Sequence, residues 1–239
     1  LFNAITKAGA EAANFPFCTI EPNVGVVEVP DHRIYDLAAM FKPKKTTPAF
    51  TRFVDIAGLV AGASKGEGLG NQFLSHIRET DAIAHVVRCF EDGNITHVEG
   101  SIDPVRDMDI INTELCLADL ESVDKKKTKT AKLAQAGIKE AKGELPVLQK
   151  VYDALQNGTP ARALDLSEDD LEILKELNLI TLKPVLYVLN MSEDDISDPM
   201  ANPHVKAAAE QAEKEGAKWV PISAEIEQEV SELDADEAK

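Results

Sequence analysis

The chain has 239 residues, 44% of them hydrophobic, and a formal net charge of −17. This length suits one large domain or two small ones, and the acidic balance argues against nucleic-acid binding by the average surface, because phosphate binding needs clustered Lys and Arg. No apolar run approaches the roughly 20 residues of a membrane helix, and Cys18, Cys89 and Cys116 lack a metal-binding spacing. We therefore expect a cytoplasmic protein with free thiols and no membrane partner.

Short strands alternate with helices along most of the chain. Such alternation predicts an α/β fold with a doubly wound, mainly parallel sheet covered by helices on both faces. Pro30 should stop the first strand, and Asp31 is a suitable N-cap for the helix that follows it. The expected elements are helices over 1–9, 31–41, 71–81, 203–216 and the end of the chain, and strands over 24–29, 49–58, 82–90, 183–190 and 217–223.

Residues 107–156 break this rhythm, because apolar residues recur there at three- and four-residue spacing. Two long helices in tandem predict an antiparallel helical hairpin inserted into the α/β domain. We expect the first part of the α/β domain over 1–106, the helical insertion over 107–160 and the second part of the α/β domain over 161–239.

The hairpin carries the only dense basic cluster of the sequence, Lys125–Lys132. Two interpretations stay open. The cluster is either a solvated helix end or a contact point for RNA or a ribosomal surface.

The stretch "VDIAG" places Asp55 at the end of an apolar strand and Gly58 three positions later. This D-x-x-G pattern is typical of nucleotide switches, in which the carboxylate holds a Mg²⁺-bound water and the glycine N–H approaches the γ-phosphate. Thr19 precedes it in an upstream loop, where its hydroxyl could reach the same Mg²⁺. The glycine-rich residues 58–70 then indicate a loop that changes shape with the nucleotide state.

The strand "VLYVLN" ends at Asn190 and continues with Met191, Ser192 and Glu193. GTPases carry N-K-x-D here, and its Asp accepts two hydrogen bonds from guanine. The extra methylene of Glu193 displaces its carboxylate, and each charge-assisted hydrogen bond is worth roughly 1.5–3 kcal/mol. The pattern therefore makes adenine plausible.

The last strand is followed by Ser223, Ala224 and Glu225, which match the turn that presents a backbone N–H to a base. No G-x-x-x-x-G-K-[ST] phosphate loop occurs in the sequence. Residues 1–9 are of the kind that follows such a loop, so we expect the chain to begin just after it.

Six stretches of the sequence together resemble the YchF subfamily of the Obg-related P-loop NTPases. They are "NFPFCTIEPNVGVV", "FVDIAGLVAGASKGEGLGNQFL", "IRETDAIAHVVRCF", "DIINTELCLADL", "TLKPVLYVLN" and "VPISAEIEQEV". The resemblance extends over nearly the whole chain. It implies a Ras-like domain with a coiled-coil insertion, here without its first strand, its phosphate loop and the C-terminal TGS domain. It also implies a monomer that hydrolyses ATP, often in preference to GTP, with Mg²⁺ and in association with the ribosome, with tRNA or rRNA as further partners.

By position, the resemblance makes Thr19 and Asp55 the Mg²⁺ ligands, Asp55 through water, and Gly58 a phosphate contact. Asn190, Met191 and Glu193 would border the base, with Ser223, Ala224 and Glu225 as its other wall. Leu59 stands where related enzymes place a water-orienting Gln, so a K⁺ ion or the ribosome is expected to position the water.

Two functions follow from these patterns. The first is a slow, Mg²⁺-dependent ATPase that acts as a ribosome-linked switch in translation or the stress response. The second is a non-hydrolysing module that binds the ribosome or RNA, which the absent phosphate loop and the helical hairpin favour. We expect little catalysis from these 239 residues alone.

Overall fold

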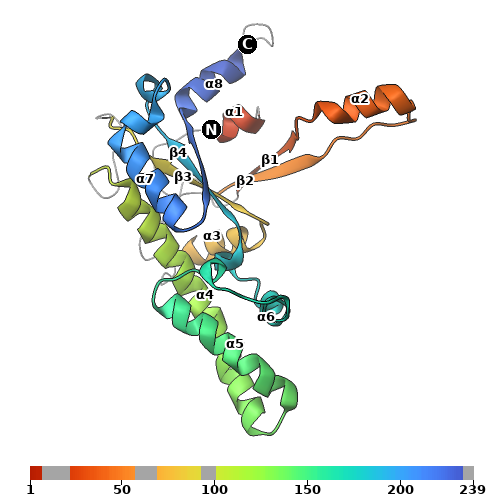
Figure 1. Cartoon of the computed structure of the whole chain (residues 1–239), viewed down its shortest axis with the longest axis vertical. Coiled ribbons are helices and arrows are strands. Elements are labelled where there is room, and N and C mark those ends of the chain that lie inside the picture. Colours follow the sequence, from red (N-terminus) through yellow and green to blue (C-terminus); the bar gives the residue numbers. More distant parts are fainter. Residues whose placement is uncertain (7–21, 57–68, 93–100, 234–239) are drawn as a thin grey trace. The chain divides into compact units, whose positions relative to one another are not determined.

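A computed structural model of the protein describes residues 1–6, 22–56, 69–92 and 101–233 (Figure 1). The chain forms two compact units, the first of Leu1–Ala57 with Ala224–Lys239 and the second of Gly58–Ser223. Within the described ranges, no helix is both long and apolar enough to cross a membrane.

An antiparallel pair of strands forms the sheet of the first unit, and its register pairs Asn23 with Asp55. The helix between the strands begins where the Asp31 carboxylate accepts a hydrogen bond from the backbone N–H of Arg33 at 3.1 Å. This confirms the N-cap expected from the sequence. The elements of the first unit are α1 (Phe2–Thr6), β1 (Asn23–Glu28), α2 (His32–Phe41), β2 (Phe50–Asp55) and α8 (Ala224–Glu232).

Three parallel strands in the order β3-β4-β5 form the sheet of the second unit (Figure 1). The predicted parallel α/β sheet is thus confirmed. The elements of the second unit are α3 (Leu69–Arg78), β3 (Ile83–Arg88), α4 (Pro104–Gln135), α5 (Lys139–Gln156), α6 (Glu168–Leu174), β4 (Val185–Asn190), α7 (Pro203–Lys214) and β5 (Lys218–Ile222).

One core of the second unit joins α4 and α7 to the sheet. Met108 of α4, Tyr187 of β4 and Val205 of α7 are fully buried in the same cluster. Complete burial of a large apolar side chain contributes about 1.5–3 kcal/mol. The first turns of α4 are therefore anchored on the strands.

Helices α4 and α5 form the predicted hairpin (Figure 1). The Asp103 side chain accepts a hydrogen bond from the backbone N–H of Arg106 at 3.0 Å, and Pro104 occupies the first turn of α4. The turn between the helices needs the left-handed backbone of Gly137, with φ of 93°. A second core of Cys116, Leu148 and other buried residues fills the space between the helices.

Residues 157–182, to which sequence patterns assign no element, form α6 and short 3₁₀ turns, one of them Ile180–Leu182. A capping box between Ser167 and Asp170 starts α6. The division of the chain at residues 106 and 160 into two domain parts and an insertion stays a prediction.

Candidate nucleotide site

The carboxyl ends of the three parallel strands meet at one edge of the sheet. Arg88 of β3 is in register with Asn190 of β4, which is in register with Ile222 of β5. The pairing continues past the strand ends, because the Cys89 N–H donates to the Asn190 carbonyl at 2.7 Å and the Met191 N–H to the Ile222 carbonyl at 2.8 Å. Ligands of open parallel sheets bind at such an edge.

The loop after β4 turns sharply at this edge. The Ser192 hydroxyl oxygen accepts a hydrogen bond from the backbone N–H of Asp194 at 3.3 Å, which starts a 3₁₀ turn at Glu193. The Glu193 side chain is exposed, whereas Met191 is buried in the core with 4% exposure. The loop therefore offers the Glu193 carboxylate to a ligand, and a contact of the Met191 side chain with a base stays a prediction.

Ser223 is the predicted site residue that comes directly after Ile222, the register partner of Asn190. It follows β5 directly, and it is 3% exposed. Ala224 and Glu225 begin α8, which belongs to the first unit. Of the predicted base-binding residues, the second unit thus brings together Asn190, Met191, Glu193 and Ser223.

Asn202 joins two of the loops at this edge, and motif reasoning missed it. Its Nδ2 donates to the Cys89 carbonyl at 3.1 Å and to Oδ2 of Asp195 at 2.7 Å. Its Oδ1 accepts from the backbone N–H groups of His204 and Val205, which caps α7. The Asn-Pro pair at 202–203 is a helix-start signal that could have found the cap, but the contact with Cys89 spans 113 positions of sequence.

The acidic character of the loop limits its chemistry. Glu193, Asp194, Asp195 and Asp198 supply carboxylates within six residues. Carboxylates accept hydrogen bonds from the N–H groups of a base and repel phosphate. This loop suits a base, and phosphate binding has to come from other residues.

The strand edge of the second unit includes none of the described phosphate and metal residues that the sequence predicts. Asp55 ends β2 in the first unit with an exposed side chain. Thr19, Gly58 and Leu59 lie outside the described residues. In the ranges that the structure describes, no group of three or more His, Cys, Asp or Glu side chains could hold a metal ion.

A polar cluster lies under the sheet, on the face covered by α4 and α7. The Tyr187 hydroxyl donates to Oε2 of Glu215 at 2.6 Å and accepts from Nδ2 of Asn112 at 3.0 Å. Burial, together with the bond to Glu215, raises the pKa of Tyr187. Burial, assisted by the charge of Arg162, lowers the pKa of the neighbouring His85 to about 4. Both side chains are therefore uncharged near neutral pH.

Known proteins resemble this chain in sequence. Residues 1–114 match the family model described as "50S ribosome-binding GTPase". The chain resembles the Ribosome-binding ATPase YchF of Bacillus subtilis, with 53% identity over 237 residues, and that of Pasteurella multocida, with 55%. It covers 65% and 64% of their lengths, and each match spans 99% of this chain.

A solved structure shows the same fold. The Schizosaccharomyces pombe YchF GTPase matches 99% of this chain with a TM-score of 0.80 and 40% sequence identity, and this chain covers 65% of it. The fold is thus that of the α/β domain of the P-loop GTPase class. Within that class, the chain is similar to the YchF proteins over 99% of its length.

Proposed function

We propose that the protein binds ATP and hydrolyses it slowly with Mg²⁺, as a cytosolic, monomeric, ribosome-associated switch in translation or the stress response. GTP is the alternative nucleotide. The observation that carries this proposal is the strand edge where Asn190 and Ser223 lie together and Glu193 is exposed. The chain covers about 65% of its relatives' length, and their names, Ribosome-binding ATPase, support the activity and the partner.

The choice between adenine and guanine depends on Glu193. Its carboxylate stands one methylene further from the backbone than the Asp of guanine-specific sites, on a turn fixed by Ser192. An acceptor that misses the two guanine hydrogens loses roughly 1.5–3 kcal/mol per charge-assisted bond. This loss removes the usual preference for guanine and makes adenine plausible.

Mg²⁺ would be held by Thr19 and, through water, by Asp55. The exposed carboxylate of Asp55 at the end of β2 fits this role, since Mg²⁺ prefers oxygen ligands and retains several waters. The ion would neutralise charge on the phosphates. Gly58 would contact phosphate through its N–H. Leu59 carries no side-chain amide that could orient the attacking water, so a K⁺ ion or the ribosome would position that water.

Nucleotide selectivity tests the proposal. In the full-length protein, calorimetry and phosphate release should show ATP binding and slow turnover, and Glu193→Asp should raise the GTP-to-ATP affinity ratio about tenfold, the effect of 1.4 kcal/mol. Glu172→Asp is the matched control, because Glu172 is an exposed residue of α6 paired with Lys175. A strong guanine preference without ATP hydrolysis in the unsubstituted protein would refute the adenine assignment.

The basic cluster supports a second candidate function, a non-hydrolysing module that binds RNA or a ribosomal surface. Lys126 pairs with Glu176 at 3.0 Å, and the Lys127 ammonium lies 3.0 Å from the centroid of the Tyr152 ring. Lys132 and Lys142 line an open groove between α4 and α5, and Lys127 lines it as well. Lysines facing one groove could contact successive phosphates.

A double variant distinguishes this module from the switch. Lys132→Gln with Lys142→Gln should weaken binding of the full-length protein to ribosomes and flatten its salt dependence. Lys125→Gln is the control, because Lys125 is exposed and paired with Glu121. Retained ribosome binding without any heat on addition of ATP and Mg²⁺ would favour the module over the switch.

A further inference from the structure

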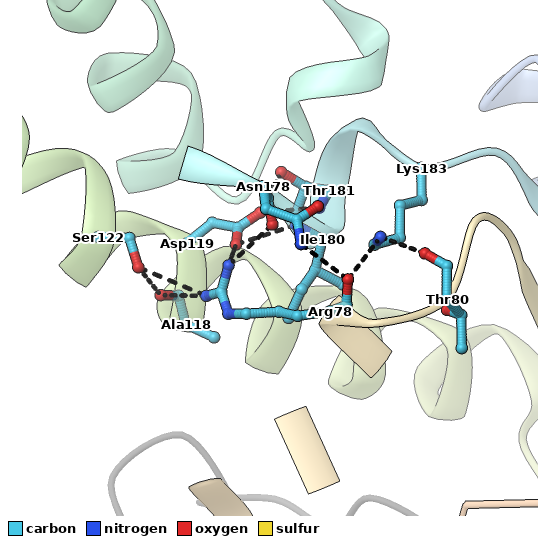
Figure 2. Close-up of polar contacts among 9 residues, drawn as sticks. All are labelled: Arg78, Thr80, Ala118, Asp119, Ser122, Asn178, Ile180, Thr181 and Lys183. Atoms are coloured by element: carbon cyan, nitrogen blue, oxygen red, sulfur yellow. Dashed lines mark hydrogen bonds and ion pairs between the residues drawn. The ribbon is translucent and has the colours of Figure 1, made fainter. Parts of the chain in front are cut away.

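The side chain of Arg78 joins the end of α3 to the middle of α4 (Figure 2). Its Nη1 lies 3.1 Å from Oδ1 of Asp119 and donates to the Asn178 carbonyl at 3.1 Å. Its Nη2 donates to the Ala118 carbonyl at 3.2 Å and to Oγ of Ser122 at 3.5 Å. One guanidinium thus spans a helix, the helical hairpin and the segment that precedes β4.

Asp119 is fully buried, and its other partners come from that segment. Its Oδ1 accepts from the Ile180 N–H at 3.1 Å, and its Oδ2 accepts from the N–H and the hydroxyl of Thr181, each at 2.7 Å. These three hydrogen bonds do not involve Arg78. The carboxylate therefore stays largely satisfied if the guanidinium leaves.

The end of α3 has its own partners as well. The Arg78 carbonyl accepts from Nζ of Lys183 at 3.0 Å and from Nδ2 of Asn178 at 2.9 Å, and Lys183 also donates to the Thr80 carbonyl (Figure 2). A cation at the carboxyl end of a helix satisfies its last carbonyls and its dipole. Without the Arg78 side chain, α3 thus remains attached to the segment before β4.

These contacts give Arg78 and Asp119 different roles. The Arg78 side chain retains 24% exposure, whereas that of Asp119 has none. Release of the guanidinium into water leaves the Asp119 carboxylate buried, but three hydrogen bonds from Ile180 and Thr181 still solvate it. The release therefore costs less than breaking all the Asp119 bonds. Such a contact can exist in two states, engaged and released, which coupling between distant sites requires.

We propose that Arg78 is a positioning residue that couples nucleotide binding to the helical hairpin through α3 and α4. This coupling rests on the proposed function. Along the chain, α3 follows the predicted switch residues Asp55 and Gly58, and α4 carries the basic cluster Lys125–Lys132 beyond Asp119. A partner held by the hairpin then changes nucleotide affinity by the same factor as the nucleotide changes affinity for that partner.

Hydrogen exchange of the full-length protein, with and without ATP and Mg²⁺, tests this coupling. In the unsubstituted protein, the nucleotide should alter amide exchange in α3 and around Asp119 on α4. In Arg78→Ala, the α4 response should fall about fivefold or more, the lower end of typical coupling factors, while ATP affinity stays within about twofold. Arg33→Ala is the matched control, because Arg33 is an exposed arginine paired with Asp31 in the first unit.

Each outcome separates the coupling from the proposed function. ATP binding with an undiminished α4 response in Arg78→Ala would overturn the coupling alone, and so would a response of the unsubstituted protein confined to α3. A flat calorimetric titration of the unsubstituted protein with ATP and Mg²⁺ would overturn the proposed function and the coupling with it. If Arg78→Ala does not fold, Arg78→Gln has to show the same reduced response, and a full response would refute the role of the charge.

Discussion

Asp119 on α4 accepts two hydrogen bonds from Thr181, one from its backbone N–H and one from its hydroxyl, and both measure 2.7 Å. Both residues are fully buried, and 62 positions of sequence separate them. The pair fixes the hairpin to the segment that enters β4, and β4 ends at Asn190. The position of the hairpin and the position of the candidate base-binding residue therefore depend on the same buried carboxylate.

Asp119→Asn should cost about 3 kcal/mol of unfolding free energy. The substitution turns one acceptor oxygen into an NH₂ group that faces N–H and hydroxyl donors, and it removes the charge that pairs with Arg78. Urea unfolding measures the change. Glu121 lies two residues further along the helix and forms an exposed ion pair with Lys125. Glu121→Gln should lower the free energy of unfolding by less than about 0.5 kcal/mol. Equal costs for the two variants would show that the Asp119 network contributes no more than a surface pair.

Tyr187→Phe should destabilise the protein by about 1–2 kcal/mol. The variant keeps the buried ring but removes the hydroxyl that bonds Glu215 and Asn112. Thermal and urea unfolding report the loss. Tyr152→Phe retains the ring that lies beneath Lys127 and should be nearly neutral. A neutral Tyr187→Phe would mean that Glu215 and Asn112 find other partners.

The stability of the protein should fall as the pH falls from about 6.5 towards 4, and His85 should contribute to this loss. Its folded pKa, about 4, lies below its ordinary value of 6.5 because burial and the charge of Arg162 disfavour the imidazolium. The unfolded chain therefore binds the proton first. The unfolding free energy that the lowered pKa of His85 contributes is complete above pH 6.5. This contribution decreases as the pH falls towards 4, by no more than about 3 kcal/mol.

Paired measurements isolate this contribution from that of the carboxyl groups. His85→Phe, which keeps a ring beside Tyr187, should lose less stability between pH 6.5 and pH 4.5 than the unsubstituted protein. His32→Phe, at an exposed position of α2, should leave the slope unchanged. Identical slopes for His85→Phe and the unsubstituted protein would contradict the lowered pKa of His85.

Gly25→Ala should destabilise the first unit by about 1–3 kcal/mol, as overpacking does in other cores. A Cβ at Gly25 would lie 2.2 Å from Cγ2 and 2.6 Å from Cβ of Thr6, so α1 would have to move away from β1. Gly143→Ala is the matched control on α5, where an added Cβ meets no atom within 4 Å. It should instead stabilise its helix by about 0.5–1 kcal/mol. A stable Gly25→Ala protein would contradict the packing of α1 on β1.

Local signals account for the elements that sequence patterns predicted correctly. Alternating apolar residues followed by Pro30 mark β1, Asp31 caps α2, and Pro203 begins α7. These signals act within a few residues, so they can be read along the chain. The 3₁₀ turns at 161–182 carry no such period, and only α6 has a recognisable capping box there.

The motif residues at the strand ends are likewise predictable. Parallel strands place their carboxyl ends at one edge, so the sequence predicts Asn190 and Ser223 at the same edge of the sheet. The role of Asn202 was not predictable, because its side chain bonds the Cys89 carbonyl 113 positions away. Neither the residue type nor its spacing in the sequence predicts such a contact.

Periodicity, caps and motifs are local properties of the chain, so they predict the alternation of helices and strands, the helical hairpin and the resemblance to the YchF family. The burial of Met191 beside the exposed Glu193, and the contact of Arg78 with Asp119, arise only in the folded protein. Burial and long-range hydrogen bonds depend on which surfaces meet when the elements pack. The chain acquires those contacts only on folding.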